Sequence, residues 1–504
     1  MRIKKSVDVK LNVKPVFMNL EHEGPNPERT KDIDANSAYE GPCRLGEGSM
    51  LTNSYDKKMG MESFKRFSKA FDSYPDYVNV LKPEYLHWTD SFIVKEELFN
   101  QVKDDLANTD ILLADGVLKT FPILQIAEKA KVAAGDIGCC SADFSAGARA
   151  HGVEGYGFID HEHVKRFSRL LRAKKAMLNS RILYVVKDMI TPYGSVCNIE
   201  PHDMKMNTGV QYRVICVDTL LDACRNLNET QLKEVDSKAK ELVDGAAWNE
   251  MSFEDVKKSV VLYVGVKTLL EKYECNAFTM PCHEVCATRK FNDEFQFTPC
   301  LTHSLLKEDG IPSGCECDLN SLLAVALLEN LTMTAPHMGN TGPYYEPEYV
   351  HPETGDFSVP KGLPPIPVSA EDRENIFYTF HAVQTRKQKG LDKPNASYGL
   401  KSFTRSGWGA TIRTNMKEDV GEKITVVRFS PDAKKMLVIN GEIVAESGNE
   451  EFGCGNGIYW KCRDGRDAFW KQQNFGHHMA WVYGDHTRDL LELGEMMGIE
   501  VVTA

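Results

Sequence analysis

Long apolar runs are absent from this sequence of 504 residues. No stretch approaches the roughly 18 consecutive apolar residues that a membrane-spanning helix needs, so we expect no membrane association. The N-terminus, MRIKKSVDVKLNVK, is basic, but the apolar segment of a secretory signal does not follow it. We therefore expect a soluble, cytoplasmic protein.

Basic charge is also scarce. Lysine and arginine together number 60, against 72 aspartates and glutamates, which gives a net charge of −12. Nucleic-acid-binding surfaces need clustered positive charge. This balance therefore argues against a nucleic-acid partner and favours an acidic enzyme with a small-molecule substrate.

Several catalytic signatures are missing as well. No Walker sequence and no G-x-S-x-G segment occur, so nothing indicates an NTPase or a serine hydrolase. The 14 cysteines include no paired C-x-x-C motifs, which would strongly indicate zinc. We interpret them as reduced, buried thiols. The segment GCGNG (453–457) resembles half of a dinucleotide fingerprint, but it precedes the strand-like IYWKC and so predicts a turn.

What the sequence does contain is an alternation of strands and helices. Apolar runs predict strands at 110–116, 181–186, near YRVICVD and at 276–282, and helices at 163–178, 253–273 and 319–331. The last helix carries apolar residues at the spacing of one helical face, as in an amphipathic helix. Such alternation predicts parallel sheets and two tandem Rossmann-like α/β domains.

The pattern changes near residue 343. Seven prolines fall within 343–367, and short strands follow them, including KMLVINGEIVAES with its Asn-Gly hairpin signal. We therefore predict the following order: an N-terminal α/β domain (1–180), a second α/β domain (181–342), a proline-rich linker (343–370) and a β-rich, barrel-containing domain (371–504).

Three polar segments are candidates for chemistry. PCHEVC (281–286) follows a predicted strand, where His283 is either a substrate contact or an ordinary cap. In GHHMAWVYGDH, His477 and His478 face opposite sides of a strand, so one of them can face a site while the other packs. In CECDLN, Glu316 and Asp318 suit a helix N-terminus, a role that requires no function.

Two motifs, taken together, resemble the L-fucose isomerase and L-arabinose isomerase superfamily. In the fucose isomerase branch a G-I-P-x-x-C-E-x-D segment and helix lead to G-D, and a C-terminal H-x-A-x-x-Y-G motif follows. This chain has GIPSGCECDLNSLLAVALLENLTMTAPHMGN and HMAWVYGDHTRDLLELGEMMGIEVV. The resemblance implies two Rossmann-like domains, a barrel-containing C-terminal domain and assembly into a homo-oligomer, a trimer or hexamer.

The resemblance also implies a metal site. Its members bind Mn²⁺ through a glutamate, an aspartate and a histidine, which correspond here to Glu316, Asn340 and His478. His381 occupies a position similar to a further metal-side histidine of the arabinose branch. A carboxylate and an imidazole suit Mn²⁺, although other divalent metals remain open. We name His477, His283 and Trp88 as candidate substrate contacts.

Asn340 departs from the family pattern, because an amide cannot serve as a base near neutral pH. Replacing an anion by an amide leaves more positive charge at the metal and favours a metal-bound hydroxide. We therefore favour a C–C bond hydrolase that opens a cyclic 1,3-diketone, similar to the manganese-dependent dihydrophloroglucinol cyclohydrolases. The alternative is an aldose–ketose isomerase in which Glu346, Glu348 or Asp318 replaces the missing aspartate. A metal-free sugar-binding or regulatory protein is the third hypothesis.

Overall fold

A computed structural model of the protein describes residues 3–20, 53–88, 96–116, 119–138, 141–187, 197–282, 285, 293–344 and 372–504. The chain forms two compact units: an N-terminal unit of residues 10–172, and a C-terminal unit of residues 1–9 and 173–504. Within the described residues, none of the helices combines the length and apolar content that crossing a membrane requires.

The N-terminal unit is built on a parallel sheet with the strand order β2–β1–β4–β5–β6, in which β3 also pairs with β1. Its apolar core lies between this sheet and the helices. The strands are β1 (Leu11–Leu20), β2 (Val78–Val80), β3 (Glu84–Trp88), β4 (Ile111–Gly116), β5 (Ala133–Ile137) and β6 (Gly155–Phe158). The helices are α1 (Asn53–Ala70), α2 (Glu96–Leu106), α3 (Thr120–Ala130), α4 (Ser141–Ala150) and α5 (His161–Leu178), of which residues 161–172 belong to this unit.

The C-terminal unit contains a second parallel sheet, with the order β11–β10–β7–β8. Its strands are β7 (Arg181–Val186), β8 (Gln211–Cys216), β10 (Ala277–Thr279) and β11 (Ser313–Gly314). The helices along this part of the chain are α6 (Pro201–Thr208), α7 (Val217–Arg225), α8 (Glu229–Gly245), α9 (Phe253–Lys272), α12 (Cys300–Glu308) and α13 (Leu319–Thr332). A small sheet joins β9 (Trp248–Asn249), β14 (Tyr398–Ser402) and β15 (Ala410–Thr414).

The rest of the C-terminal unit is a closed antiparallel barrel. Its strands follow the order β16–β19–β12–β13–β18–β17, and pairing of β16 with β17 closes it. They are β12 (His337–Pro343), β13 (Ile376–Phe380), β16 (Lys423–Phe429), β17 (Lys435–Ser447), β18 (Gly457–Cys462) and β19 (His478–Tyr483). The outer strand β20 (Glu500–Thr503) pairs with β17, and α14 (Gly465–Gln472) and α15 (Thr487–Met497) complete the unit.

This architecture confirms the predicted class, an α/β protein with parallel sheets and a barrel in its C-terminal part. The exact domain boundaries stay a prediction, and most of the expected linker lies outside the described residues. Strand β12 carries Asn340 and was expected in the second α/β domain; it lies instead in the barrel.

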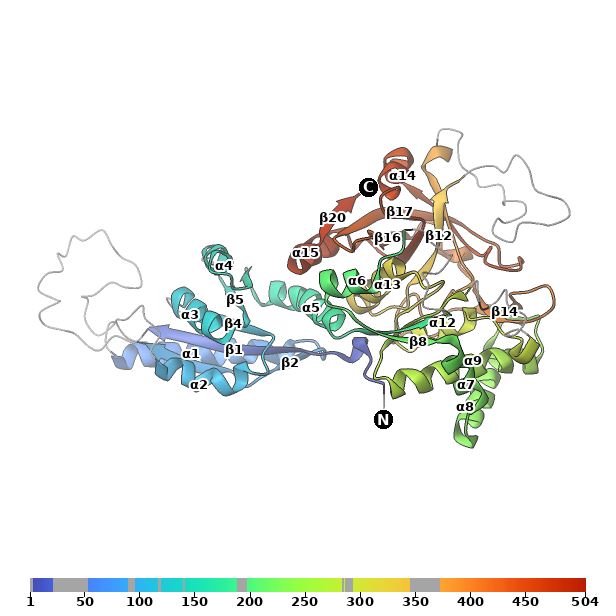
Figure 1. Ribbon diagram of the computed structural model, residues 1–504. Helices are drawn as coiled ribbons and strands as arrows, with labels where there is room; N and C mark the ends of the chain where they lie inside the picture. The colour runs from blue at the N-terminus through green and yellow to red at the C-terminus, as the bar shows by residue number, and fades with distance from the viewer. Residues whose placement is uncertain are drawn as a thin grey trace, which may run out of the picture. The chain divides into compact units, whose positions relative to one another are not determined.

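Helix α13 differs from the amphipathic helix that its apolar spacing predicts. Every residue from Leu319 to Leu331 is buried, including the polar Asn320, Glu329 and Asn330. The helix contacts β11 of the parallel sheet and β16 and β19 of the barrel. Figure 1 shows α13 next to the barrel strand β16. A helix that is buried all round needs tertiary partners for its polar groups. Asn320, for example, donates to the backbone carbonyl oxygens of Phe429 and Ser430.

The expected Asn-Gly hairpin is wrong. Asn440 and Gly441 lie inside the continuous strand β17, which pairs with β16 on one side and β18 on the other. Gly441 is not in the left-handed conformation that a type I′ turn requires. A Cβ atom there would lie 2.4 Å from Cε3 of Trp460, so the glycine allows a close approach of this ring.

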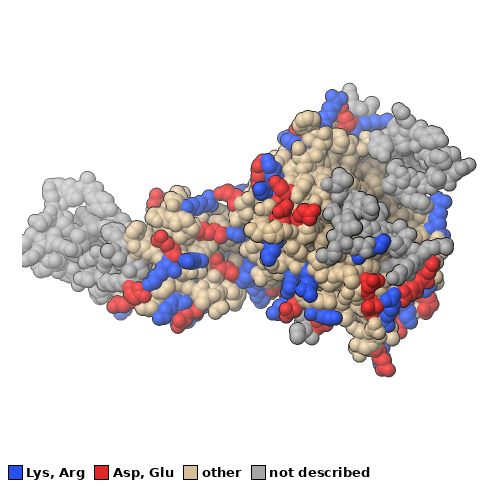
Figure 2. Space-filling view, in the orientation of Figure 1, with Lys and Arg blue, Asp and Glu red and all other residues tan. Residues whose placement is uncertain are grey.

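On the face shown in Figure 2, acidic and basic side chains of the described residues are interspersed, and no broad basic area is visible among them. The absence of a nucleic-acid partner stays a prediction.

Candidate active site

The site begins where two neighbouring parallel strands of the C-terminal unit end. Cys282 follows β10, and Glu316 follows β11, so both lie at the carboxyl edge of the sheet, where α/β proteins place binding groups. Glu316 and Cys317 have φ values of +61° and +55°, a left-handed conformation that is uncommon for residues other than glycine.

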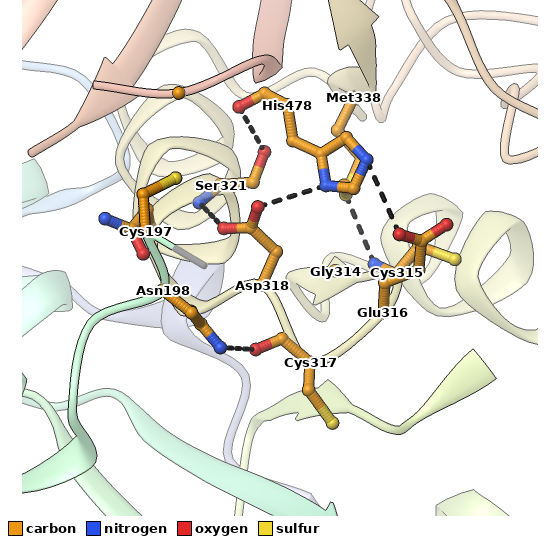
Figure 3. A network of polar contacts seen from close by, with 12 residues as sticks. Cys197, Asn198, Gly314, Cys315, Glu316, Cys317, Asp318, Ser321, Met338 and His478 are labelled. Atoms are coloured by element: carbon orange, nitrogen blue, oxygen red, sulfur yellow. Dashed lines mark hydrogen bonds and ion pairs between the residues drawn. The ribbon is translucent and has the colours of Figure 1, made fainter. Parts of the chain in front are cut away.

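The surrounding structure holds this unusual turn in place. The backbone N–H of Cys317 donates to the carbonyl oxygen of Met280 at 3.1 Å, and the side-chain amide of Asn198 donates to the carbonyl oxygen of Cys317 at 2.7 Å (Figure 3). Backbone strain of this kind persists only where neighbours over-determine it, and it concentrates at functional sites.

Asp318, one of the two acids in this turn, is fully buried. Its carboxylate accepts the backbone N–H of Ser321 as the N-cap of α13, Nη1 of Arg428 at 2.9 Å and Nδ1 of His478 at 3.0 Å. Burial alone would raise the pKa of Asp318, but the Arg428 guanidinium and the bond from His478 outweigh it and hold the pKa below its ordinary range. Asp318 is therefore an anion with a positioning role.

His478 is oriented by this anion. An ionised carboxylate only accepts hydrogen bonds, so Nδ1 of His478 must carry the proton and Nε2 of the neutral ring carries a lone pair. Figure 3 shows Nε2 directed toward Glu316, and it lies 3.6 Å from Oε2. Within the described part of the chain, this buried nitrogen has no hydrogen-bond partner.

His381, which follows β13, lies beside the other oxygen of the Glu316 carboxylate. Its Nε2 lies 3.2 Å from Oε1 of Glu316, and its ring is 5.7 Å from that of His478 between centroids. Glu316 is 7% exposed and each histidine is 1% exposed, so the three groups meet in a dry environment. When Glu316 is ionised it accepts the N–H of His381 Nε2, so the lone pairs open to a divalent cation are those of the carboxylate and of His478 Nε2, and this carboxylate–imidazole pair fits the implied metal.

Asn340 is half-buried and lies directly opposite His478 in the antiparallel pair β12–β19. Residues opposite one another across a ladder project from the same face, so Asn340 lies on the face that carries His478.

Among the other predicted site residues, His477 lies beside this group, with its ring centroid 4.4 Å from that of His478. His477 precedes β19 and is exposed, whereas His478 is buried, so the two histidines differ in burial as their alternation predicts. Trp88 ends β3 in the N-terminal unit. His283, Glu346 and Glu348 lie outside the described residues.

Sequence reasoning missed two features. Arg428 in β16 gave no signal, because only the tertiary structure brings it to Asp318. The second feature is a thiol cluster: Sγ of Cys282 lies 3.1 Å from Sγ of Cys315 and 3.3 Å from Nε2 of His303. Burial alone would raise the pKa of the Cys282 thiol, but its contacts with Cys315 and His303 hold the pKa well below its ordinary value. Neither cysteine stands in a metal-binding spacing, so the sequence contained only the C-x-C at 315–317 as a hint.

A buried carboxylate between two imidazoles at the carboxyl edge of a parallel sheet is an arrangement that can hold a divalent cation. No protein-family model matches the chain. The chain is 24% identical to the sulfoquinovose isomerases of Priestia aryabhattai and of Priestia megaterium (strain ATCC 12872 / QMB1551). Each alignment spans 348 residues, 67% of this chain and 68% of the relative. The chain is thus a distant relative of sugar isomerases, and these relatives are enzymes.

Proposed function

We propose that this protein is an aldose–ketose isomerase that requires a divalent cation, with Mn²⁺ the first candidate. The observation that carries the proposal is the Glu316 carboxylate between the buried Nε2 atoms of His381 and His478, in a chain related to sugar isomerases. Similarity to isomerases supports this reaction and not the C–C bond hydrolase that Asn340 alone led us to favour.

The reaction moves one proton between neighbouring carbons and another between neighbouring oxygens. Glu316 removes the proton from C2 of the open-chain aldose, which gives a cis-enediol, and returns it to C1. The hydroxyl proton passes from O2 to O1, and we assign this transfer to the imidazole of His381, which lies beside Glu316. A cation held by Glu316 and His478 would polarise the carbonyl.

Asp318 and Asn340 have supporting roles in this proposal. Asp318 cannot replace the missing acid, because Arg428, Ser321 and His478 already occupy its oxygens. It fixes the ring of His478 with Nε2 toward Glu316. Asn340 lacks a basic group, but its amide can donate to, or accept from, a substrate hydroxyl on the face that it shares with His478.

The test begins with metal analysis of the purified protein and continues with a Mn²⁺-supplemented assay of aldoses. Sulfoquinovose, the sugar in the relatives' name, comes first, followed by L-fucose and L-arabinose; a cyclic 1,3-diketone is assayed in parallel. We expect a ketose product from at least one aldose. In D₂O, deuterium should enter C1 of the ketose, because the enediol exchanges its proton with solvent.

Two buried glutamates provide a matched pair for this assay. Glu316→Gln should abolish both turnover and exchange. Glu329→Gln should leave both intact, because burial already raises the pKa of Glu329 well above its ordinary value and keeps it neutral. Turnover of the diketone with no turnover of any aldose would reject the isomerase in favour of the hydrolase.

A further inference from the structure

Cys282, His303 and Cys315 form a cluster that the proposed isomerase chemistry does not use. One ligand atom from each lies within 4.8 Å of the other two, and all three residues are buried. They come from three adjacent elements: Cys282 follows β10, Cys315 follows β11, and His303 lies on α12, which packs against β11. We propose that these residues bind a second metal ion, a zinc-class cation with a structural role, beside the Glu316 site.

The ring of His303 is oriented as a metal ligand usually is. Its Nδ1 lies 2.7 Å from the hydroxyl oxygen of Ser313, which in turn donates to the carbonyl oxygen of Phe278. Its Nε2 faces Sγ of Cys282 at 3.3 Å, and metal binding requires the tautomer in which Nδ1 carries the proton. Metal-bound histidines are usually oriented by a hydrogen bond of this kind from their other ring nitrogen.

The spacing also suits a tetrahedral ion. Zn–S bonds of about 2.3 Å and Zn–N bonds of about 2.0 Å place two donors roughly 3.5 to 3.8 Å apart in a tetrahedral site. Here the two sulfur atoms are 3.1 Å apart, and Cys282 Sγ and His303 Nε2 are 3.3 Å apart. The sulfur pair thus has to open by about 0.7 Å and the sulfur–nitrogen pair by about 0.2 Å. Binding would release two protons to solvent, one from the thiol of Cys315 and one that Cys282 and His303 share.

The donor chemistry separates this cluster from the neighbouring site. Two thiolates and an imidazole select a softer ion than the carboxylate, amide and imidazoles around Glu316. Cys315 also lies within 4.8 Å of ligand atoms of Glu316 and His381, so the two sites are adjacent. The soft cluster should therefore hold zinc while the site at Glu316 holds a harder ion such as Mn²⁺.

A metal at the thiol cluster would have a structural consequence for Glu316. Its backbone N–H donates to Sγ of Cys282 at 3.3 Å, and Cys315 is its neighbour in the chain. An ion that binds both sulfur atoms would fix Cys315, which precedes Glu316 in the chain. It would also fix Cys282, whose sulfur accepts the backbone N–H of Glu316. It would thereby stabilise the left-handed turn that carries the carboxylate.

The test compares the full-length protein with Cys282→Ser and with a matched control, Cys275→Ser. Cys275 is also buried, but it precedes β10, whereas Cys282 follows it. After expression with Zn²⁺ and Mn²⁺, elemental analysis should find about one zinc per chain in the wild type and in Cys275→Ser, and almost none in Cys282→Ser. Manganese should stay bound in the wild type and in Cys275→Ser.

Cobalt provides a readout that is independent of activity and of zinc contamination. Co²⁺ exchanged into the wild type should show a sulfur-to-cobalt charge-transfer band and the intense visible bands of a tetrahedral ion. The charge-transfer band should disappear in the Cys282→Ser/Cys315→Ser double variant and weaken in His303→Gln. Circular dichroism of each variant checks that it is folded.

Absence of the charge-transfer band in the folded wild type, or equal zinc in Cys282→Ser and Cys275→Ser, would overturn the proposal and leave a hydrogen-bonded thiol pair only. Neither result depends on turnover of a sugar, so failure of the second metal site and failure of the isomerase function are distinguishable.

Discussion

Each parallel sheet of this protein has a buried carboxylate at its carboxyl edge. Asp136 lies near the end of β5 in the N-terminal unit, with Nζ of Lys119 3.1 Å from Oδ1. Glu316 follows β11 in the C-terminal unit, with Nε2 of His381 3.2 Å from Oε1 and Nε2 of His478 3.6 Å from Oε2. Asp136 is 1% exposed and Glu316 is 7% exposed.

The two carboxylates differ in the side chains that lie next to them. An ammonium group only donates, so Lys119, which also lies 3.7 Å from Oδ1 of Asp115, places positive charge beside Asp136 but adds no lone pair for a cation. A neutral imidazole has one donor and one acceptor nitrogen, and Asp318 directs the acceptor of His478 toward Glu316. The same position at a sheet edge therefore gives an internal ion pair in one unit and a candidate cation site in the other.

The largest effect that tests this difference is on catalysis. Glu316→Gln should lower kcat by about 10²- to 10⁴-fold, because the amide cannot remove a proton. Asp136→Asn, the matched change at the other sheet edge, should leave the deuterium exchange per turnover unchanged. Steady-state assays and exchange in D₂O measure both. Equal losses of kcat in the two variants would remove the distinction between the edges.

The next largest effect is on stability. Lys119→Met leaves the buried Asp136 carboxylate without its closest cation and should lower the free energy of unfolding by about 3 kcal/mol. The double variant Lys119→Met/Asp136→Asn should recover most of that loss, because no charge remains uncompensated. Urea unfolding followed by circular dichroism measures the cycle. Additive losses in the double variant would show that the two side chains are not coupled.

A smaller effect concerns the group that orients His478. Asp318→Asn removes the anion that fixes the ring and should weaken Mn²⁺ affinity about 10- to 100-fold. Titration calorimetry with Mn²⁺ measures the change. Ser321→Ala is the control: it removes only the hydroxyl that donates to the carbonyl oxygen of His478 and should bind Mn²⁺ almost as the wild type does. Undiminished affinity in Asp318→Asn would contradict the orienting role.

The smallest expected effect is a pH dependence of stability. Burial raises the pKa of Asp136 above its ordinary value, although Lys119 opposes the shift. The folded state then binds this proton more tightly than the unfolded state. The stabilisation is complete below the unfolded pKa of about 3.9 and is lost as the pH rises through the folded pKa.

Urea unfolding of the wild type and Asp136→Asn across mildly acidic pH measures this dependence. The stability of the wild type relative to Asp136→Asn should fall as the pH rises. Asp143→Asn, a change at an exposed aspartate of the same unit, should show no such trend relative to the wild type. If the stability of the wild type relative to Asp136→Asn instead rose with pH, the pKa of Asp136 would be lowered by folding and the expected shift would have the wrong sign.

Much of the fold could be predicted locally. The apolar run at 181–186 matches β7, and the predicted helix at 253–273 matches α9 to within one residue, because periodicity and length report local structure well. The Asn-Gly pair at 440–441 does not form the predicted hairpin turn, because β17 pairs with the strands on both sides and this pairing overrides a local turn preference. For α13, the spacing predicted the helix but not its burial on all sides, which depends on the barrel that packs over it.

By itself, the sequence determined the chemical types at the candidate site: a carboxylate at 316, an amide at 340 and imidazoles at 381 and 478. It also predicted that Glu316 lies at the N-terminus of a helix and that His478 lies on a strand. Only the tertiary structure decided their states. Asp318 became a buried anion because Arg428, 110 positions away, reaches it, and this anion decides which nitrogen of His478 faces Glu316. Residues distant in sequence create the electrostatic environment of Asp318 and His478, and a local sequence pattern does not predict it.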